Sequence, residues 1–405
     1  MLAAGGGAAA RVWEEVNALA SEPGMLNMGQ GFPDFPGSAL AREVASDAVA
    51  KGEARQNQYS PQPGLLQLRE AIAAFHARRY ATDWAATDVI VTAGAQEGLA
   101  AAFSAFLDPG DEVILCEPFY PFMLGAVRLA GAVPRVVTLR PPDFSIDAGV
   151  LRTIEALAAS ERCKMIVLNT PHNPTGHVAT EAELHGVASI CVSHELLAVA
   201  DEVYEHCVFP ASGAAHRQLC SLPGMRERTI TLGSGGKLFS LTGWRVAWAI
   251  GPSELTAPLG AAHTHLTFSA PTPLQAGIAA ALADEHVDIE LDQVRDLFAG
   301  NFELLSAALC ELTMEAAPYG TETGPGLAVK SVCKAQGGYF LVAETNHGVS
   351  DVEFCRMLAK EKKIACTPMS VFYSSEAEAE NCKLVRFTIC KSRQHIERVC
   401  AQLRS

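Results

Sequence analysis

Short hydrophobic runs that alternate with helical stretches are the feature that most constrains the fold of this chain. Between residues 88 and 251 the runs are DVIVTAG, DEVILCE, VPRVVTL, KMIVLNT, LLAVADEVY, TITLGS and RVAWAIG. Several of them are followed by hydrophobic residues at helical spacing. Strands that alternate with helices form a mostly parallel sheet whose two faces are covered by helices. The sequence therefore predicts an α/β core.

The hydrophobic pattern changes after about residue 282, where long amphipathic helices are followed by the strands YFLVAE, IACTPM and LVRFTIC. This pattern is typical of a second, smaller α+β unit. The chain of 405 residues also exceeds the roughly 250 to 300 residues at which a single hydrophobic core stops growing. We therefore expect a large domain of residues 38–290 and a small domain of residues 1–37 and 291–405. Residues 320–338 have the composition of turns and predict a surface loop.

Charge and cysteine pattern argue against several classes of function. The formal net charge is -14, and an acidic surface repels nucleic acids and anionic lipids. The 12 cysteines are scattered, without a C-x-x-C pair or zinc-like spacing, which favours a reducing compartment and no metal site. No hydrophobic run approaches the ~18 residues of a membrane span. We expect a cytoplasmic protein, and a short organelle-targeting role of the N-terminus stays open.

Polar groups and glycines follow three of the predicted strands, at the edge where parallel sheets bind ligands. PHNPTG (171–176) follows KMIVLNT, DEVY (201–204) follows LLAVA, and GGKLFSLTGWR (235–245) follows TITLGS. Lys237 lies between two glycines and a hydrophobic stretch, and such surroundings can exclude water from an amine and make it nucleophilic. By composition alone, Lys237 also fits a solvated loop lysine.

The same region lacks two common nucleotide-binding motifs. A Walker A loop requires G-x-x-x-x-G-K-[ST], but Thr231 occupies the first glycine position and Leu238 replaces the final hydroxyl residue. A dinucleotide-binding fingerprint is also missing, because no G-x-G-x-x-G joins a predicted strand to a helix. Neither nucleotide class is predicted.

Five separated elements stand in an order that is typical of one enzyme family. They are Asn173-Pro-x-Gly176, Asp201-x-x-Tyr204, Ser234-x-x-Lys237, Arg245 and Arg386. Together they resemble the class I aminotransferases of pyridoxal 5'-phosphate (PLP) fold type I, and the resemblance runs from Trp13 to the C-terminal helix. NMGQGFPDFP (27–36), YSPQPG (59–64), TPHNPTG and SVFY (370–373) are most similar to kynurenine/glutamine transaminases and bacterial methionine aminotransferases.

The resemblance implies roles for the residues on the cofactor side. Lys237 resembles the lysine that binds PLP as a Schiff base and moves the α-proton. Asp201 matches the carboxylate that keeps the pyridine nitrogen protonated. The other implied cofactor-binding residues are Asn173 and Tyr204 at the phenolic oxygen, Tyr120 against the ring, Ala95, Gln96, Ser234 and Arg245 at the phosphate, and Tyr59 from the partner subunit. The phosphate position also has a physical reason, because a helix that begins at Ala95 presents free N–H groups to an anion.

On the substrate side, Arg386 resembles the arginine that binds the α-carboxylate as a bidentate pair. Gly31 and Asn173 match the groups beside it. Trp13, Phe268 and Phe372 resemble pocket walls. The sequence offers no clear match to the second arginine of dicarboxylate-specific relatives, and Ser269 stands where kynurenine-type members often carry a histidine.

These matches imply a PLP-dependent transfer of the amino group from a neutral L-amino acid to a 2-oxo acid, by a ping-pong mechanism in a homodimer with shared active sites. Methionine, glutamine, leucine, aromatic amino acids and kynurenine are the implied donors. Two alternatives stay open. A PLP-dependent cysteine-S-conjugate β-lyase begins with the same loss of the α-proton, so Lys237 does not distinguish the two reactions. A PLP-sensing module without catalysis is disfavoured by the acidic charge.

Overall fold

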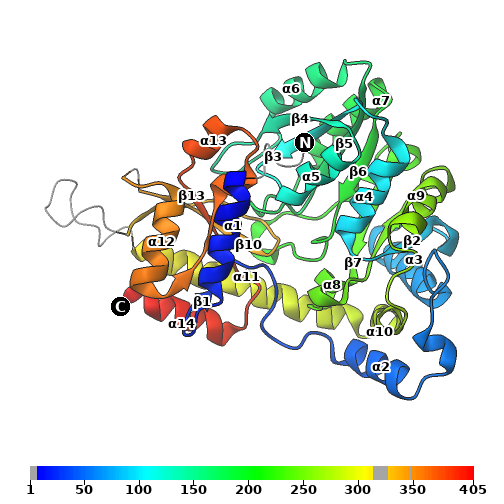
Figure 1. The fold of residues 1–405 in the computed structure, drawn as a ribbon, viewed down its shortest axis with the longest axis horizontal. Coiled ribbons are helices and arrows are strands. Elements are labelled where there is room, and N and C mark those ends of the chain that lie inside the picture. Colours follow the sequence, from blue (N-terminus) through cyan, green and yellow to red (C-terminus); the bar gives the residue numbers. More distant parts are fainter. Residues whose placement is uncertain (1–6, 313–326, 347) are drawn as a thin grey trace, which may run out of the picture.

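The computed structural model describes residues 7–312, 327–346 and 348–405, and Figure 1 shows a large sheet and a smaller sheet joined by a long helix. The strands of the large sheet are β2 (Val89–Thr92), β3 (Glu112–Glu117), β4 (Val133–Thr138), β5 (Cys163–Asn169), β6 (Leu197–Asp201), β7 (Thr229–Ser234) and β8 (Ala247–Ile250). Their order is β2-β8-β7-β6-β5-β3-β4. Only β8 runs antiparallel to its neighbours, β2 and β7. The predicted, mostly parallel α/β core is confirmed.

Helices cover both faces of this sheet. They are α2 (Ala39–Ala50), α3 (Leu66–Tyr80), α4 (Ala95–Phe106), α5 (Pro121–Leu129), α6 (Ala148–Ala158), α7 (Glu181–Ser193), α8 (Gly235–Leu238), α9 (Ser253–Leu266) and α10 (Thr272–Ala283). Alternate residues of one strand enter different cores: Ile166 packs in the cluster that includes α6 and α7, and Val167 in the cluster that includes α4 and α9. Because both faces are buried, the sequences of the strands are continuous hydrophobic runs.

The second part of the molecule contains a four-stranded antiparallel sheet in the order β12-β13-β10-β9. Its strands are β9 (Val329–Val332), β10 (Phe340–Thr345), β12 (Thr367–Pro368) and β13 (Leu384–Thr388), and a separate parallel pair is formed by β1 (Leu26–Asn27) and β11 (Ile364–Ala365). The helices are α1 (Gly7–Ala20), α11 (Val287–Glu311), α12 (Asp351–Lys362), α13 (Glu376–Glu380) and α14 (Arg393–Arg404). Short 3-10 helices lie at Ala54–Asn57, Ala86–Asp88, Pro210–Ser212, Leu219–Ser221, Arg226–Arg228, Thr242–Trp244 and Met369–Phe372.

The prediction of a surface loop at residues 320–338 is wrong for part of that range, and its first seven residues lie outside the described residues. Val329–Val332 form β9, which pairs with β10. Val329 is buried, and Lys330 Nζ lies 2.7 Å from Glu344 Oε1 across the strand pair. An edge strand of four residues depends on the partner strand for its hydrogen bonds. Its own amino-acid composition therefore predicts a strand only weakly.

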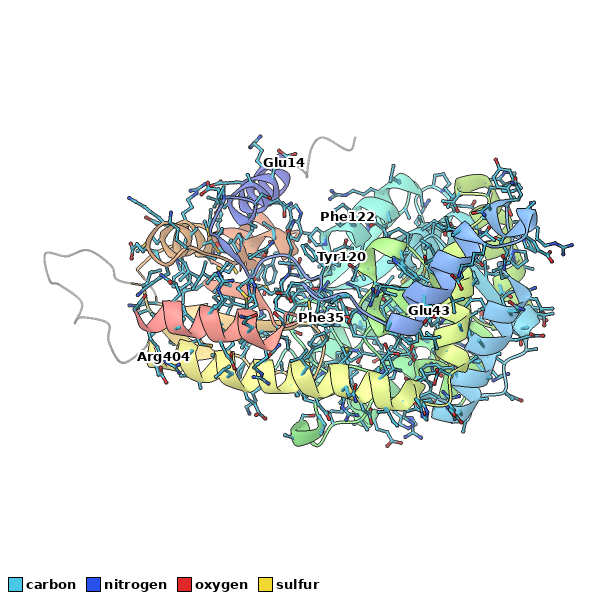
Figure 2. The ribbon with its side chains drawn as sticks, turned by 90° about the horizontal axis from the view of Figure 1, so that it is seen from below. Glu14, Phe35, Glu43, Tyr120, Phe122 and Arg404 are labelled. Atoms are coloured by element: carbon cyan, nitrogen blue, oxygen red, sulfur yellow. The ribbon has the colours of Figure 1, made fainter. Side chains whose placement is uncertain are left out.

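The two parts meet along α11, which runs beneath both of them in Figure 2. Leu291 belongs to the hydrophobic cluster of the large sheet, whereas Phe298 and Leu305 belong to the cluster of the small sheet. Leu26 from the N-terminal segment also belongs to the second cluster. We propose a domain division of 38–290 against 1–37 with 291–405, because the side chains of α11 change core close to residue 290.

Among the described residues, no helix is long and hydrophobic enough to cross a membrane. The same residues contain no group of three or more His, Cys, Asp or Glu side chains arranged to hold a metal ion.

Candidate active site

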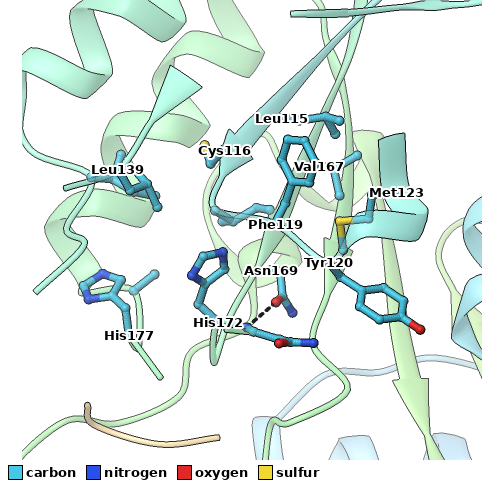
Figure 3. Close-up of a pocket in the computed structure, with 14 residues that line it drawn as sticks. Leu115, Cys116, Phe119, Tyr120, Met123, Leu139, Val167, Asn169, His172 and His177 are labelled. Carbon is cyan, nitrogen blue, oxygen red and sulfur yellow. Dashed lines mark hydrogen bonds between the residues drawn. The ribbon is translucent and has the colours of Figure 1, made fainter. Parts of the chain in front are cut away.

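Three neighbouring parallel strands end in polar residues at one edge of the large sheet: β5 at Asn169, β6 at Asp201 and β7 at Ser234. Asn169 and Asp201 are register partners. The Asn169 amide donates to the Asp201 backbone carbonyl (2.7 Å) and accepts from the Asn173 backbone N–H (2.7 Å). Figure 3 shows the second of these bonds, with the Tyr120 hydroxyl pointing away from Leu139. The loop after β5 is therefore fixed against the end of β6.

An open cavity lies at this edge of the sheet. The predicted site residues that line it are Trp13, Gly31, Ala95, Gln96, Tyr120, Asn173, Asp201, Tyr204, Ser234, Lys237, Arg245 and Arg386. The lining residues that the sequence analysis did not name are Asn17, Gln30, Leu99, Asn169, Val203 and Phe340. Residues from both parts of the chain thus meet in one cavity.

Three predicted site residues do not line this cavity. The buried Phe372 ring lies 4.6 Å from the Arg386 guanidinium carbon and packs edge-on against Trp13 at 6.0 Å. Tyr59 and Phe268 form an edge-to-face pair at 5.1 Å, with 81% and 44% of their surfaces exposed. Phe372 therefore lies behind the cavity, and the other two form an aromatic pair on the surface.

Lys237 lies in α8, directly after β7. Its Nζ is 5.0 Å from the ring centre of Tyr339 and 5.3 Å from that of Tyr204. The Tyr339 hydroxyl donates to the Lys237 backbone carbonyl at 2.6 Å. Burial lowers the pKa of the Lys237 amine, and Arg245 lowers it further. Gly235 keeps this turn close to α10, because a Cβ there would lie 2.8 Å from Ile278.

Asp201 is a buried carboxylate with an unmet hydrogen-bonding requirement. Its Oδ1 makes no hydrogen bond to any described residue. Burial raises the pKa of Asp201 to about 6, because an ionised group loses favourable hydration inside the protein. A charged N–H donor in the cavity would satisfy the free oxygen and restore the ionised form.

The start of α4 is built for an anion. Gly94 precedes the helix with φ +99°, and a Cβ there would collide with the guanidinium of Arg245. This glycine lets Arg245 lie against the first turn, where N–H groups lack partners within the helix and the helix dipole is positive. Ser234 lines the same end of the cavity. A phosphate group fits these donors.

Arg386 is a second group in the cavity that suits an anion. It extends from β13 and is buried, with Nη1 donating to Asn173 Oδ1 (3.0 Å) and Nη2 to the Gly29 carbonyl (2.9 Å). The Arg386 Nε is buried without a partner among the described residues. Burial lowers the pKa of Arg386 to about 10, so the side chain stays charged at neutral pH. A carboxylate ligand would supply the missing counter-charge.

The comparisons with known proteins agree with this geometry. The family model described as aminotransferase class I and II matches residues 23–403. The chain belongs to this family. It is therefore an aminotransferase, and the resemblance found in the sequence is confirmed.

Three relatives of this aminotransferase illustrate the match. A probable N-succinyldiaminopimelate aminotransferase of Mycobacterium tuberculosis is 40% identical over 395 residues, which cover 95% of this chain and 92% of the relative. A solved structure of the N-succinyldiaminopimelate aminotransferase from M. tuberculosis superposes with a TM-score of 0.86 and 37% identity over 97% of this chain and 96% of that chain. The methionine aminotransferase of Escherichia coli (strain K12) is 34% identical over 396 residues (97% and 95% of the chains), and a kynurenine–oxoglutarate transaminase of Dictyostelium discoideum is 32% identical over 397 residues (94% and 90%).

Aminotransferases of this class depend on PLP, and the cavity of this aminotransferase fits that cofactor. The unpartnered Asp201 oxygen suits a protonated pyridine nitrogen. The first turn of α4, with Arg245 against it, suits the phosphate. The buried amine of Lys237 suits the aldehyde. The ring nitrogen, the phosphate and the aldehyde of PLP therefore each have a complementary group in the same cavity.

Proposed function

We propose that this aminotransferase transfers the amino group of a neutral L-amino acid to a 2-oxo acid by a ping-pong mechanism. The observation that carries the proposal is the substrate end of the cavity. Apart from Asp201, Lys237 and Arg245, which we assign to the cofactor, Arg386 is the charged side chain among the described residues that line the cavity, and Trp13, Asn17, Gln30 and Phe340 are uncharged. A second carboxylate would find no counter-charge, so methionine, glutamine, leucine, and aromatic amino acids including kynurenine are the donors that fit.

We assign the substrate carboxylate to Arg386, with Gly31 and Asn173 beside it. PLP, when bound, supplies an electron sink for the negative charge that develops at the substrate α-carbon. Lys237 holds the cofactor and then accepts the α-proton, because burial lowers the pKa of its amine toward the range of a general base. Asp201 keeps the ring nitrogen protonated, and Tyr204 and Asn173 donate to the phenolic oxygen.

The remaining roles concern the position of the cofactor. We propose that Tyr120 stacks on the ring and that Ala95, Gln96, Ser234 and Arg245 bind the phosphate. Together these groups hold the α-carbon over Lys237 and exclude water from the reacting atoms. Trp13 and, behind it, Phe372 bound the space for the substrate side chain.

We also propose a two-fold homodimer in which Tyr59 reaches the phosphate site of the partner. The exposed aromatic pair of Tyr59 and Phe268 supports this, because exposed aromatic clusters are usually covered by another surface. Mixing Lys237→Ala chains with Tyr59→Ala chains, after chain exchange has been demonstrated, should leave about a quarter of the sites intact and raise activity above the parental mean. Hybrids that stay at the parental mean, with Tyr59→Ala itself impaired, would place Tyr59 in its own subunit.

Free cysteines throughout the chain support a reducing, cytoplasmic location.

A substrate panel tests the proposed donors. The holoenzyme is assayed with methionine, glutamine, leucine, kynurenine, phenylalanine and aspartate against several 2-oxo acids, and kcat/KM is compared. We expect a neutral donor to give the highest value. Aspartate as the best donor would contradict the proposal, and pyruvate with ammonia formed from a cysteine conjugate without an acceptor would favour the β-lyase.

A further inference from the structure

Three side-chain amides form a hydrogen-bonded chain along the substrate end of the cavity. Asn27 Oδ1 accepts the backbone N–H groups of Gly29 and Gln30, both at 3.2 Å. Asn27 Nδ2 donates to Gln30 Oε1 at 2.8 Å, and Gln30 Nε2 donates to Asn17 Oδ1 at 3.0 Å. The backbone thereby fixes the orientation of all three amides, because reversing any one would place two donors or two acceptors opposite each other.

The free end of this chain is the Nδ2 of Asn17. Asn17 lies in α1 and lines the cavity together with Trp13 and Gln30. Its Oδ1 is occupied by Gln30, so the remaining polar atom of the side chain is a donor. No hydrogen bond joins this Nδ2 to another residue in the described parts of the chain. The cavity wall at Asn17 therefore offers an N–H group without a partner in the described residues.

The same loop also holds the group that we assign to the substrate carboxylate. The Gly29 carbonyl accepts from Arg386 Nη2 (2.9 Å) and from Thr367 Oγ1 (3.1 Å), while the Gly29 N–H donates to Asn27. A Cβ on Gly29 would already lie 3.1 Å from Thr367 Oγ1, so the loop has little room to shift. Arg386 and the amide chain are therefore parts of one rigid unit.

We propose that Asn17 determines substrate specificity by donating a hydrogen bond to a neutral carbonyl oxygen in the substrate side chain, with Gln30 as the residue that positions it. This inference rests on the proposed function. Glutamine is the simplest donor of this class. A carboxylate would lose more hydration than one neutral N–H group replaces, whereas an aliphatic side chain would leave the N–H group unpaired.

Three amino donors test the proposal in the holoenzyme: L-glutamate γ-methyl ester, which carries only acceptors, L-glutamine, which carries an acceptor and a donor, and L-norleucine, which carries neither. We expect the ester to exceed norleucine in kcat/KM by about tenfold in the wild type. Asn17→Leu should remove this advantage, mainly through a higher KM for the ester. The kcat/KM for norleucine should change by less than about threefold.

Asn17→Asp separates specificity from structure. It keeps the oxygen that accepts from Gln30 and replaces the donor by an acceptor. The ester should lose about tenfold in kcat/KM, while glutamine should retain most of its rate, because its own amide can turn its NH2 group to the introduced carboxylate. Damage to the fold would lower kcat/KM for all three substrates together. Glu14→Gln is the matched control, since Glu14 is exposed on the outer side of α1 (Figure 2), and it should change none of the ratios.

An ester-to-norleucine ratio near one in the wild type, or a ratio that survives Asn17→Leu while norleucine is still turned over, would overturn the role of Asn17. Failure of the wild type to turn over any neutral donor with any 2-oxo acid is a different result. It would contradict the proposed function, and this inference with it.

Discussion

Asp201 and Glu205 are two buried carboxylates, four residues apart, that line different cavities. Asp201 lines the cavity that contains Lys237 and Arg386. Glu205 lines a second open cavity, together with Tyr80 and His206. Burial raises the pKa of Asp201 to about 6 and that of Glu205 to about 7. Both side chains have oxygens without a hydrogen bond of normal geometry to the described residues, although Tyr80 is close enough to lower the pKa of Glu205.

The difference between the two carboxylates lies in what faces them. Around Asp201 are a buried amine, a helix N-terminus and a buried arginine without a carboxylate partner. The arginines that line the second cavity already have carboxylate partners, for example Arg79 with Asp288 at 3.3 Å and Arg295 with Asp292 at 2.7 Å. A raised pKa therefore reports burial, and the neighbouring groups decide whether the carboxylate serves chemistry.

The largest effect is expected from Lys237→Ala, because we propose Lys237 as the nucleophile and proton carrier of the first cavity. Transamination should fall by at least about a thousandfold, while circular dichroism shows an intact fold and PLP still binds without a covalent bond. The borohydride-trapped adduct should disappear. Turnover near the wild-type rate would remove Lys237 from the mechanism.

The same chemical change at the two carboxylates gives the sharpest comparison. Asp201→Asn should lower kcat/KM by about a hundredfold or more, because a neutral amide does not keep the ring nitrogen protonated. Glu205→Gln should lower it by less than about threefold. A loss below about tenfold for Asp201→Asn, roughly 1.4 kcal/mol, would place Asp201 outside this role. Equal losses in the two variants would mean that the second cavity also serves the reaction.

A smaller effect is expected in the stability of Glu205→Gln. The pKa of Glu205 rises from an ordinary value of 4.5 to about 7 on folding, so the folded protein binds this proton more tightly than the unfolded chain. The resulting stabilisation is complete below pH ~4.5 and is lost as the pH rises through about 7, by about 3 kcal/mol in total, since each unit of pKa corresponds to about 1.4 kcal/mol. Glutamine does not titrate. The free energy of unfolding, measured with denaturant, should therefore increase in the variant relative to the wild type between pH 5 and pH 8. A difference that does not change with pH, or one that favours the variant more at pH 5, would contradict this.

Several residues that we propose for the cofactor side end strands or follow them closely, so their place at one edge of the sheet could be predicted from the sequence. Their chemical roles are implied by the family resemblance. Asp201 is the last residue of β6 and Lys237 follows the end of β7, so the strand pattern places both residues at this edge. Asn169 ends β5 in the same way and could have been found by the same reasoning. The sequence does not predict which cavity the Glu205 side chain faces. Strand β6 ends at Asp201, so the alternation of side chains along a strand does not extend to Glu205.

The substrate side was less accessible to sequence reasoning. The role that we propose for Asn17 depends on its contact with Gln30, and the two residues come from a helix and a loop that only the folded chain brings together. Strand β9 was missed for a related reason, since its pairing with β10 is supplied by a distant segment. Local patterns indicate strands and helices, but long-range contacts decide which isolated polar residues meet.

A half-reaction with one substrate is the most direct test of the mechanism. The holoenzyme is mixed with L-glutamine or L-methionine in the absence of a 2-oxo acid, and the products are counted per subunit. We expect one equivalent of the corresponding 2-oxo acid, no ammonia, and release of the stored amino group as a new amino acid when a 2-oxo acid is added. Continuous formation of a 2-oxo acid together with ammonia, without any acceptor, would contradict amino transfer in two half-reactions.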